Sequence, residues 1–278
     1  MNLDDVQTPF LAVDRSIVRA NVDRLRSRLD RLGAGLRPHL KTAKSVEVAR
    51  PLQDETPGPI AVSTLAEAEA FADAGYRDIL YAVGIAPHKL GRVTVLAAER
   101  LRAAGHELPV VSVGSTPTAH FATDLTGVTE VRAGNFVFFD LVMAGIGVCT
   151  VADLAMSVIV TVIGHRPDKG WILTDGGWMA TSRDRGTSRQ RVDQAYGLVA
   201  DLDGTRYDDL LMSDASQEHG ILSIRPGSTA SLPDIPIGVR VRILPIHACA
   251  TAAQHDRYQV IEPGSRIVQD LWTRVRGW

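Results

Sequence analysis

Residues 36–45, with the sequence LRPHLKTAKS, bring two lysines to the end of a short apolar segment. The extended approach through Pro38 predicts a short strand over residues 36–41, with Lys41 at its end. A lysine at the end of a strand can hold a carbonyl cofactor as a Schiff base. The alternative is a solvated basic turn formed by Arg37, Lys41 and Lys44, because lysine side chains are mostly exposed.

A second motif, Gly114-Ser115-Thr116-Pro117-Thr118, follows a predicted strand and opens a predicted helix. Backbone N–H groups at a helix N-terminus attract anions, and two or three hydroxyl groups add further donors. Proline suits the first turn of a helix. The motif therefore predicts a phosphate-binding turn or, alternatively, an ordinary N-cap, for which one Ser or Thr suffices.

The third motif, residues 244–251 (LPIHACAT), places a histidine and a cysteine two positions apart. Residues two apart on a strand point to the same face, so His247 and Cys249 would present an imidazole and a thiol side by side. This donor pair suits zinc, and an incomplete set of protein ligands leaves room for water or substrate. The alternative is a buried cysteine beside a hydrogen-bonded histidine.

The first half of the chain alternates predicted strands and helices with short connections. Apolar residues at helical spacing predict a helix over 17–32 that ends at Gly33, and a second helix is capped by Thr64 with Glu67. A further helix is expected over 87–104. Such alternation implies parallel strands with right-handed crossovers. The five expected strands lie near Leu36, Ile60, Ile79, Val110 and Val131.

The pattern changes between residues 139 and 150. Helical periodicity gives way to short β-branched runs separated by turns rich in proline and glycine, which predicts an antiparallel β domain. The runs cover residues 158–163, 171–174, 221–224, 239–244 and 258–261.

Composition narrows the possible classes. The 278 residues carry a net charge of −2, so no nucleic-acid partner is expected. Two cysteines cannot build a disulfide framework, which predicts a reduced, cytoplasmic protein. The N-terminus lacks an apolar signal segment, and the longest apolar run, 155–163, is too short to span a membrane. No membrane partner is therefore expected.

Residues 37–44 resemble the pyridoxal-phosphate lysine motif of the D-threonine aldolase and D-serine dehydratase family, which is related to the N-terminal barrel of alanine racemase. Further segments resemble this family in the same order along the chain. They are residues 8–9, 63–69, 112–118, 130–134, 175–177, 218–220 and 245–249. The resemblance reaches both ends of the chain.

The resemblance implies a lyase that acts on small D-3-hydroxy amino acids and forms a homodimer. It implies two cofactors, pyridoxal 5'-phosphate and a divalent metal, with zinc first and manganese or magnesium as alternatives. The cofactor-binding residues would be His39, Lys41, Gly114, Ser115 and Thr116. The metal ligands would be His247 and Cys249, and the catalytic residues Lys41 and His247. Dehydration and retro-aldol cleavage share such a site, so both reactions remain open.

Three features depart from the family pattern. Ala43 stands where the family usually has His, and Ile246 where it usually has Asn. Family barrels have eight strands, whereas five are expected here, so roughly three strand–helix units, on the order of 100 residues, are absent. The expected α/β fold is thus an incomplete TIM-like barrel over 14–144 plus an antiparallel β domain of residues 1–13 and 145–278, which includes the N-terminal strand.

Two alternatives to a lyase follow. The missing strands motivate a degenerate, non-catalytic member with residual cofactor binding. An amino-acid racemase is the other alternative, although a racemase would have no use for the His-x-Cys pair.

Overall fold

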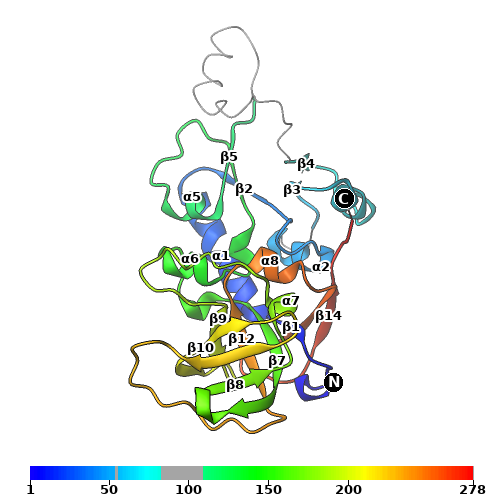
Figure 1. Ribbon diagram of the computed structural model, residues 1–278. Coiled ribbons are helices and arrows are strands. Elements are labelled where there is room, and N and C mark those ends of the chain that lie inside the picture. Colours follow the sequence, from blue (N-terminus) through cyan, green and yellow to red (C-terminus); the bar gives the residue numbers. More distant parts are fainter. Residues whose placement is uncertain (54–55, 83–108, 278) are drawn as a thin grey trace. The chain divides into compact units, whose positions relative to one another are not determined.

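The computed structural model describes residues 1–53, 56–82 and 109–277 (Figure 1). The chain divides into two compact units. The β unit comprises Met1–Ala20 and Val137–Arg274, and the β/α unit comprises Asn21–Phe136 and Val275–Trp278. The sequence places the corresponding boundaries at 13/14 and 144/145. The helix expected over 87–104 lies outside the described residues.

Six antiparallel strands of the β unit close into a barrel. The pairing of β7 with β12, in which Ile159 lies opposite Arg242, completes the ring. Closure leaves none of the six strands with an unpaired edge. In spatial order the strands are β12 (Arg240–Pro245), β9 (Gly197–Ala200), β10 (Arg206–Ala215), β11 (Gly220–Ile224), β8 (Trp171–Thr174) and β7 (Met156–Arg166). The expected antiparallel β domain is confirmed.

The N-terminal strand belongs to the β unit, as the sequence predicts. Strand β1 (Phe10–Asp14) pairs antiparallel with β7 and parallel with β13 (Arg257–Ile261), and β14 (Asp270–Thr273) pairs with β13. Apolar side chains from both ends of the chain pack together at this junction. They are Leu3, Phe10, Ala12, Ile159, Leu202 and Ile261.

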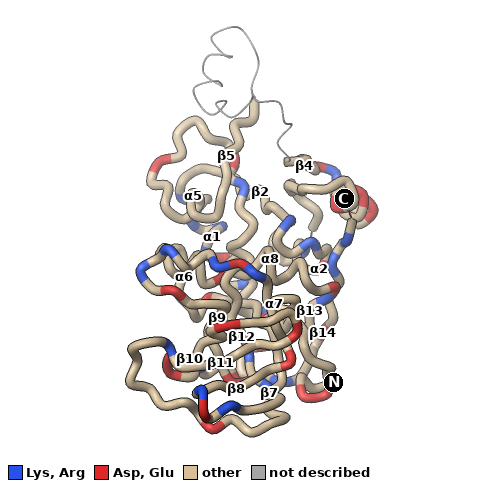
Figure 2. The backbone as a smooth tube through the Cα atoms, viewed as in Figure 1, with Lys and Arg blue, Asp and Glu red and all other residues tan. Residues whose placement is uncertain are grey.

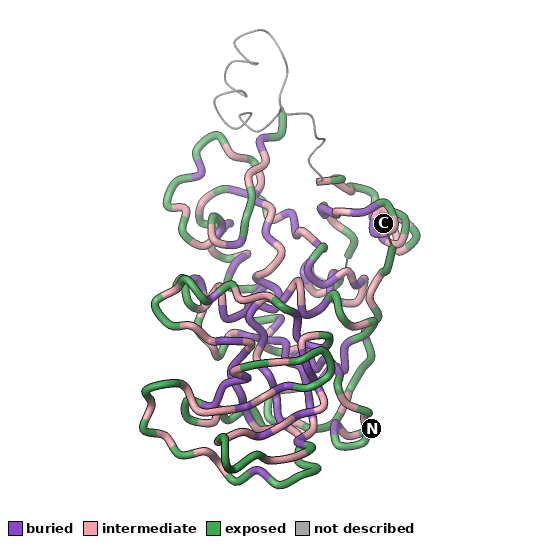
Figure 3. The backbone as a smooth tube through the Cα atoms, viewed as in Figure 1, coloured by how far each residue is buried: buried purple, intermediate pink, exposed green. Residues whose placement is uncertain are grey.

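Burial in the β unit is concentrated in β1, β9, β12, β13 and the first half of β7, whereas β10 and β14 are largely exposed or half-buried (Figure 3). Residues Met156–Val160 of β7 are all buried, and such runs of apolar and β-branched residues suit a strand covered on both faces. Charged residues of both signs are interspersed within each unit (Figure 2). No helix within the described ranges is long and apolar enough to cross a membrane.

The described residues of the β/α unit form five short parallel strands that neighbour one another in the order β5-β6-β2-β3-β4. Val131 of β6 lies opposite both Leu36 of β2 and Val113 of β5, and a bridge from His39 to Ala61 joins β2 to β3. The strands are β2 (Gly35–Pro38), β3 (Ile60–Val62), β4 (Ile79–Tyr81), β5 (Ser112–Gly114) and β6 (Glu130–Ala133). The five predicted strands are confirmed.

One helix precedes β2, and others connect the strands that follow it. They are α1 (Arg15–Arg31), α2 (Val46–Ala49), α3 (Leu65–Asp73) and α5 (Thr116–Phe121). The predicted apolar stripe of α1 is buried, and the helix ends before Gly33, whose φ of 68° suits glycine. Thr64 caps α3 by accepting the Glu67 N–H at 3.1 Å, while the Glu67 carboxylate accepts the Ser63 N–H at 3.2 Å.

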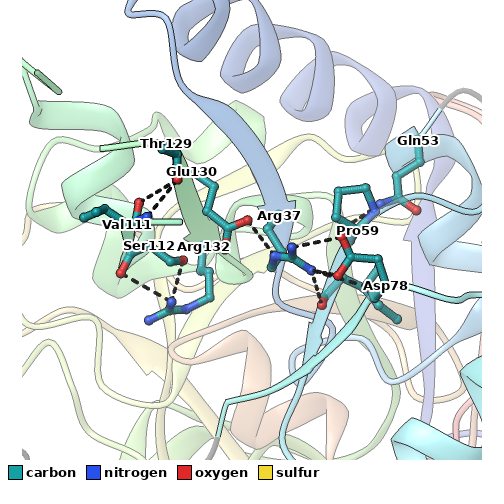
Figure 4. Close-up of polar contacts among 10 residues, drawn as sticks. Arg37, Gln53, Pro59, Asp78, Val111, Ser112, Thr129, Glu130 and Arg132 are labelled. Atoms are coloured by element: carbon teal, nitrogen blue, oxygen red, sulfur yellow. Dashed lines mark hydrogen bonds and ion pairs between the residues drawn. The ribbon is translucent and has the colours of Figure 1, made fainter. Parts of the chain in front are cut away.

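A buried arginine ties the parallel strands together near their amino ends (Figure 4). The Arg37 residue of β2 is 8% exposed. Its guanidinium group lies 2.7 Å from Glu130 of β6 and 2.7 Å from Asp78, which precedes β4. It also donates to the Ile60 carbonyl of β3 at 3.2 Å. One side chain therefore links four strands, and these contacts lower the pKa of Asp78 while raising that of Arg37.

We expect Arg37→Met to lower the free energy of unfolding by about 3–5 kcal/mol, because it leaves Glu130, whose side chain is only 12% exposed, without its partner. Arg166→Met is the matched control, since Arg166 and Asp168 form an exposed pair whose loss costs about 1 kcal/mol or less. Urea unfolding followed by circular dichroism measures both. Equal losses in the two variants would contradict a structural role for the Arg37 cluster.

Candidate functional site

The carboxyl ends of the parallel strands bring two of the predicted motifs to one edge of the β/α unit. The Lys41 turn follows β2, and Gly114 ends β5. Strands β2 and β5 flank β6, so two strand spacings, about 10 Å, separate the two motifs. Active sites of β/α folds lie at this edge. The structure thus assembles the predicted Schiff-base lysine and the predicted phosphate turn on the same face.

The three basic residues of the first motif have different environments. Arg37 is buried in its ion cluster, and the Lys44 ammonium lies 2.8 Å from the fully buried Glu67 carboxylate. Lys41 is exposed and forms no ion pair with another described residue. A solvated basic turn is therefore wrong for Arg37 and Lys44. Lys41 is the lysine of this motif whose amine is available to a ligand.

His39 lies half-buried directly after β2, where its backbone N–H donates to the Ala133 carbonyl at 2.8 Å. Burial lowers the pKa of His39 to about 4, and the positive charge of Lys41 acts in the same direction. The imidazole is therefore neutral at neutral pH. A neutral ring places no second positive charge beside the Lys41 amine.

Two glycines allow backbone to pass close to this edge. A Cβ atom on Gly134 would lie 2.5 Å from the His39 carbonyl oxygen, and one on Gly114 would lie 2.9 Å from the Arg132 carbonyl oxygen. Both distances are too short for real contacts. Glycine is therefore required at both positions. Gly134 lets the residues after β6 approach the segment that leads into Lys41, and Gly114 lets the end of β5 approach β6.

The Gly114–Thr118 motif forms the N-cap that its sequence predicts. The Ser115 hydroxyl accepts the Thr118 N–H at 3.3 Å, and Pro117 lies in the first turn of α5. The Thr116 hydroxyl is buried and accepts the Phe136 N–H at 3.3 Å. Gly114 and Ser115 are exposed, whereas the Thr116 side chain is used to hold the turn. Phosphate binding by this turn stays a prediction.

The predicted metal pair lies in the β unit, in a different local structure from the one expected. Strand β12 ends at Pro245, and His247 is the N-cap of the short helix α8 (Ala248–Ala252), which contains Cys249. The expectation that both residues lie on a strand is wrong. Alanine occupies three of the five α8 positions and favours a helix. The imidazole and the thiol are nevertheless hydrogen-bonded neighbours.

The His247 imidazole has two hydrogen-bonding partners, Asp184 and Cys249. The His247 Nδ1 atom lies 2.6 Å from Asp184 Oδ2. Hydrogen bonds to Cys249 and then to Asp184 raise the pKa of His247 to about 9, against the opposing effect of burial. A metal ion bound at this pair would have to displace a proton from the ring.

Two carboxylates that the sequence reasoning missed hold the pair in place. The fully buried Asp140 accepts the Ala248 N–H at 2.9 Å and caps α6 (Leu141–Gly145) through the Met143 N–H at 2.9 Å. Asp184 holds the imidazole. An N-cap signal marks Asp140 as the start of a helix, but neither aspartate lies near the His-x-Cys motif in sequence.

The donor set is incomplete within the described ranges. Across residues 1–53, 56–82 and 109–277, no three His, Cys, Asp or Glu side chains form a group that could hold a metal ion. His247 and Cys249 offer one nitrogen and one sulfur donor, so water or substrate would have to complete the coordination. This donor chemistry fits a catalytic metal and does not fit a closed structural site.

The first expectation from this geometry concerns Gly134. We expect Gly134→Ala to lower stability by about 1–3 kcal/mol, because the added methyl group overlaps the His39 carbonyl, and to weaken binding of pyridoxal phosphate at Lys41. Gly35→Ala on the neighbouring strand is the control, since its Cβ would make an ordinary 3.6 Å contact. Thermal unfolding and cofactor titration compare the two. Similar behaviour of both variants would contradict the close approach.

The second expectation concerns pH. The pKa of His39 in the folded state, about 4, lies below its ordinary value of 6.5, so the unfolded state binds more protons between these values. The corresponding stability is present above pH 6.5 and is lost as the pH falls toward 4. At pH 5 this loss amounts to about 2 kcal/mol, and His39→Asn should lack it. Urea unfolding at pH 7 and pH 5 compares the two proteins, and identical pH dependence would contradict the assignment.

Solved structures first define the class. The chain superimposes on an alanine racemase from Clostridium difficile 630 at a TM-score of 0.64 and 12% identity, covering 96% of this chain and 99% of that one. A D-threonine aldolase from Filomicrobium marinum gives a TM-score of 0.77 at 18% identity, with 98% and 96% of the chains covered. A parallel β/α unit and an antiparallel β-barrel unit in one chain thus define an alanine racemase-like fold.

Sequence similarity is more specific. The chain is 38% identical to a D-threo-3-hydroxyaspartate dehydratase from Delftia sp. (strain HT23) over 375 aligned positions, which cover 98% of each chain. The crystal structure of that enzyme matches at a TM-score of 0.90 over 100% of both chains. A D-serine dehydratase from Dictyostelium discoideum is 24% identical over 97% of each chain. The model of a family described as "Putative serine dehydratase domain" matches residues 155–261.

The chain therefore belongs to the family of D-serine and D-threo-3-hydroxyaspartate dehydratases, whose named members are lyases. Two further matching structures are of variants of a D-threo-3-hydroxyaspartate dehydratase. One carries a histidine-to-alanine and the other a cysteine-to-alanine replacement two positions apart, and the cysteine variant is described as metal-free.

Proposed function

We propose that this protein is a pyridoxal-phosphate- and metal-dependent lyase that dehydrates D-3-hydroxy amino acids. The observation that carries the proposal is the 38% identity with the Delftia dehydratase along nearly the whole of both chains. Dehydration is favoured over aldol cleavage, because the D-threonine aldolase relative is 25% identical over only 65% of this chain. The products would be a 2-oxo acid and ammonia.

Lys41 would bind the cofactor, with His39 beside it. The exposed Lys41 amine, free of ion pairs with the rest of the described chain, fits this role. Gly114 and Ser115 are exposed at the start of α5 and would receive the phosphate with the backbone of Thr116. Bound pyridoxal phosphate supplies an electron sink for charge that develops at the substrate α-carbon.

Lys41 is also the candidate base. Its Nζ atom would take the α-proton of the substrate, which requires the neutral amine, and the neutral state of His39 avoids a second positive charge nearby. Dehydration requires removal of the proton on the α-carbon. Retro-aldol cleavage instead breaks the bond between the α- and β-carbons. The role of Lys41 as a base for the α-proton therefore applies if the protein is a dehydratase.

His247 and Cys249 would hold the divalent metal, and zinc is the ion that this nitrogen and sulfur donor pair suits best. Manganese or magnesium would be the alternatives. The metal would supply Lewis acidity toward a hydroxyl oxygen. The alanine variants of the D-threo-3-hydroxyaspartate dehydratase support this assignment, because their two positions have the same spacing as His247 and Cys249.

We also propose that the barrel of the β/α unit is shortened. Only residues 82–111 connect β4 to β5, whereas three strand–helix units need on the order of 100 residues. The alignment with the Delftia enzyme spans 375 positions, more than the length of this chain. The same observation favours a second candidate function, a non-catalytic member with residual cofactor binding.

A cytoplasmic homodimer is the assembly we propose. Neither Cys149 nor Cys249 forms a disulfide bond, which suits a reducing compartment. A second copy would also give the shortened barrel a partner for its outer strands, since among the described strands β4 pairs with β3 alone and β5 with β6 alone.

Protein incubated with pyridoxal phosphate and zinc should show a visible absorbance band that borohydride fixes onto Lys41. It should also release ammonia from D-serine or D-threo-3-hydroxyaspartate. Lys41→Ala should abolish both signals because the amine is lost, whereas Lys169→Ala, at a surface lysine over Trp171, should change neither. A mass-spectrometric map of the reduced protein and an ammonia assay provide the measurements. Cofactor labelling without turnover would support the non-catalytic candidate, and a band that survives in Lys41→Ala would exclude the cofactor assignment.

A further inference from the structure

The His247 ring has one fixed carboxylate partner. Its Nδ1 atom lies 2.6 Å from Asp184 Oδ2, and both side chains are only partly exposed, at 39% and 36%. A carboxylate at this distance accepts the Nδ1–H of the imidazole. Once a metal ion displaces the other ring proton, the free lone pair lies on Nε2, and the histidine binds the ion through that atom.

The backbone around Asp184 is shaped to hold the carboxylate. Ser182 has a φ of 109°, which is strained for a residue with a side chain. Its hydroxyl accepts the Asp184 N–H at 3.2 Å. Gly186 follows closely, and a Cβ there would lie 2.6 Å from the Val142 side chain. The loop therefore passes tightly over its neighbours and leaves Asp184 little freedom.

The segments that carry the two partners are also tied together. Asp184 follows α7 (Trp178–Thr181), and His247 caps α8. The Thr251 hydroxyl of α8 donates to the Thr181 carbonyl at the end of α7. One ring nitrogen of His255 lies 2.8 Å from the Ala180 carbonyl. These contacts fix the distance between the start of the loop and the helix that contains Cys249.

We infer that Asp184 is a positioning residue for the metal ligand His247, an inference that rests on the proposed metal site. Its carboxylate selects the Nδ1–H tautomer and orients Nε2 toward the ion shared with Cys249. The orientation matters because the described residues provide only two protein ligands, so each contributes a large part of the affinity. Loss of such a partner typically weakens metal binding by about 10–100-fold.

Cobalt(II) is the probe, because its thiolate complex absorbs and reports the bond to Cys249. Titration of the full-length protein should give a saturable band that is absent in His247→Ala. Asp184→Asn should shift the dissociation constant by about 10–100-fold, since the amide can donate to Nδ1 and favour the wrong tautomer. Asp184→Glu keeps the carboxylate and should recover most of the affinity. Asp168→Asn, at an exposed ion pair, is the matched control and should bind as the wild type does.

At saturation, the cobalt band of Asp184→Asn should match that of the wild type, because the ligands are unchanged. An altered band would make Asp184 a direct ligand and overturn the positioning role. Unchanged affinity in Asp184→Asn, with binding lost in His247→Ala, would overturn the inference and leave the metal site standing. No saturable binding by the wild type would instead refute the metal site itself. Equal unfolding midpoints of the metal-free proteins exclude misfolding as the cause of a shift.

Discussion

The β/α unit depends on the burial of one guanidinium group. Arg37 is buried on β2, and a buried charge is costly unless it is paired and hydrogen-bonded. Glu130 and Asp78 supply the charges, and the Ile60 carbonyl supplies a further acceptor (Figure 4). The cluster ties β2 to the amino ends of β3, β4 and β6. The turns at the carboxyl ends of the strands, including the turn of Lys41, are then not needed to hold the strands together and can carry functional residues.

Elements with strong local patterns could be predicted, and elements shaped by distant partners could not. The apolar runs of β2 to β6 and the apolar stripe of α1 are sufficient to predict these strands and this helix from the sequence. Strand β10 was missed because Asp208, Asp209 and Asp214 interrupt its apolar character, and its pairing with β9 and with β11 is irregular. Helix α8 was mistaken for a strand continuation, because the β-branched run before Pro245 gives no sign that Asp140 accepts the Ala248 N–H and ends the strand.

The candidate site divides in the same way. Lys41, His247 and Cys249 carry reactive groups at recognisable spacing, so residue type and spacing are sufficient to predict them as site residues. Asp184 lies 63 positions before His247 in the sequence, and an aspartate between two arginines reads as a surface charge. Its role depends on the strained turn at Ser182 and on the contacts of α7 with α8. Such geometry arises from tertiary packing, which no local pattern encodes.

The pairing of β1 determines when the sheet of the β unit can be completed during synthesis, because both partner strands are made after β1. Residues 10–14 leave the ribosome early, but their partners are residues 156–166 and 257–261. At roughly 5–20 residues per second, an apolar strand waits on the order of 10–50 seconds for its second neighbour. Strand β1 therefore remains an aggregation-prone edge until residues 257–261 have been made. Demand for chaperones should rise when elongation is slowed between the codons for β7 and β13.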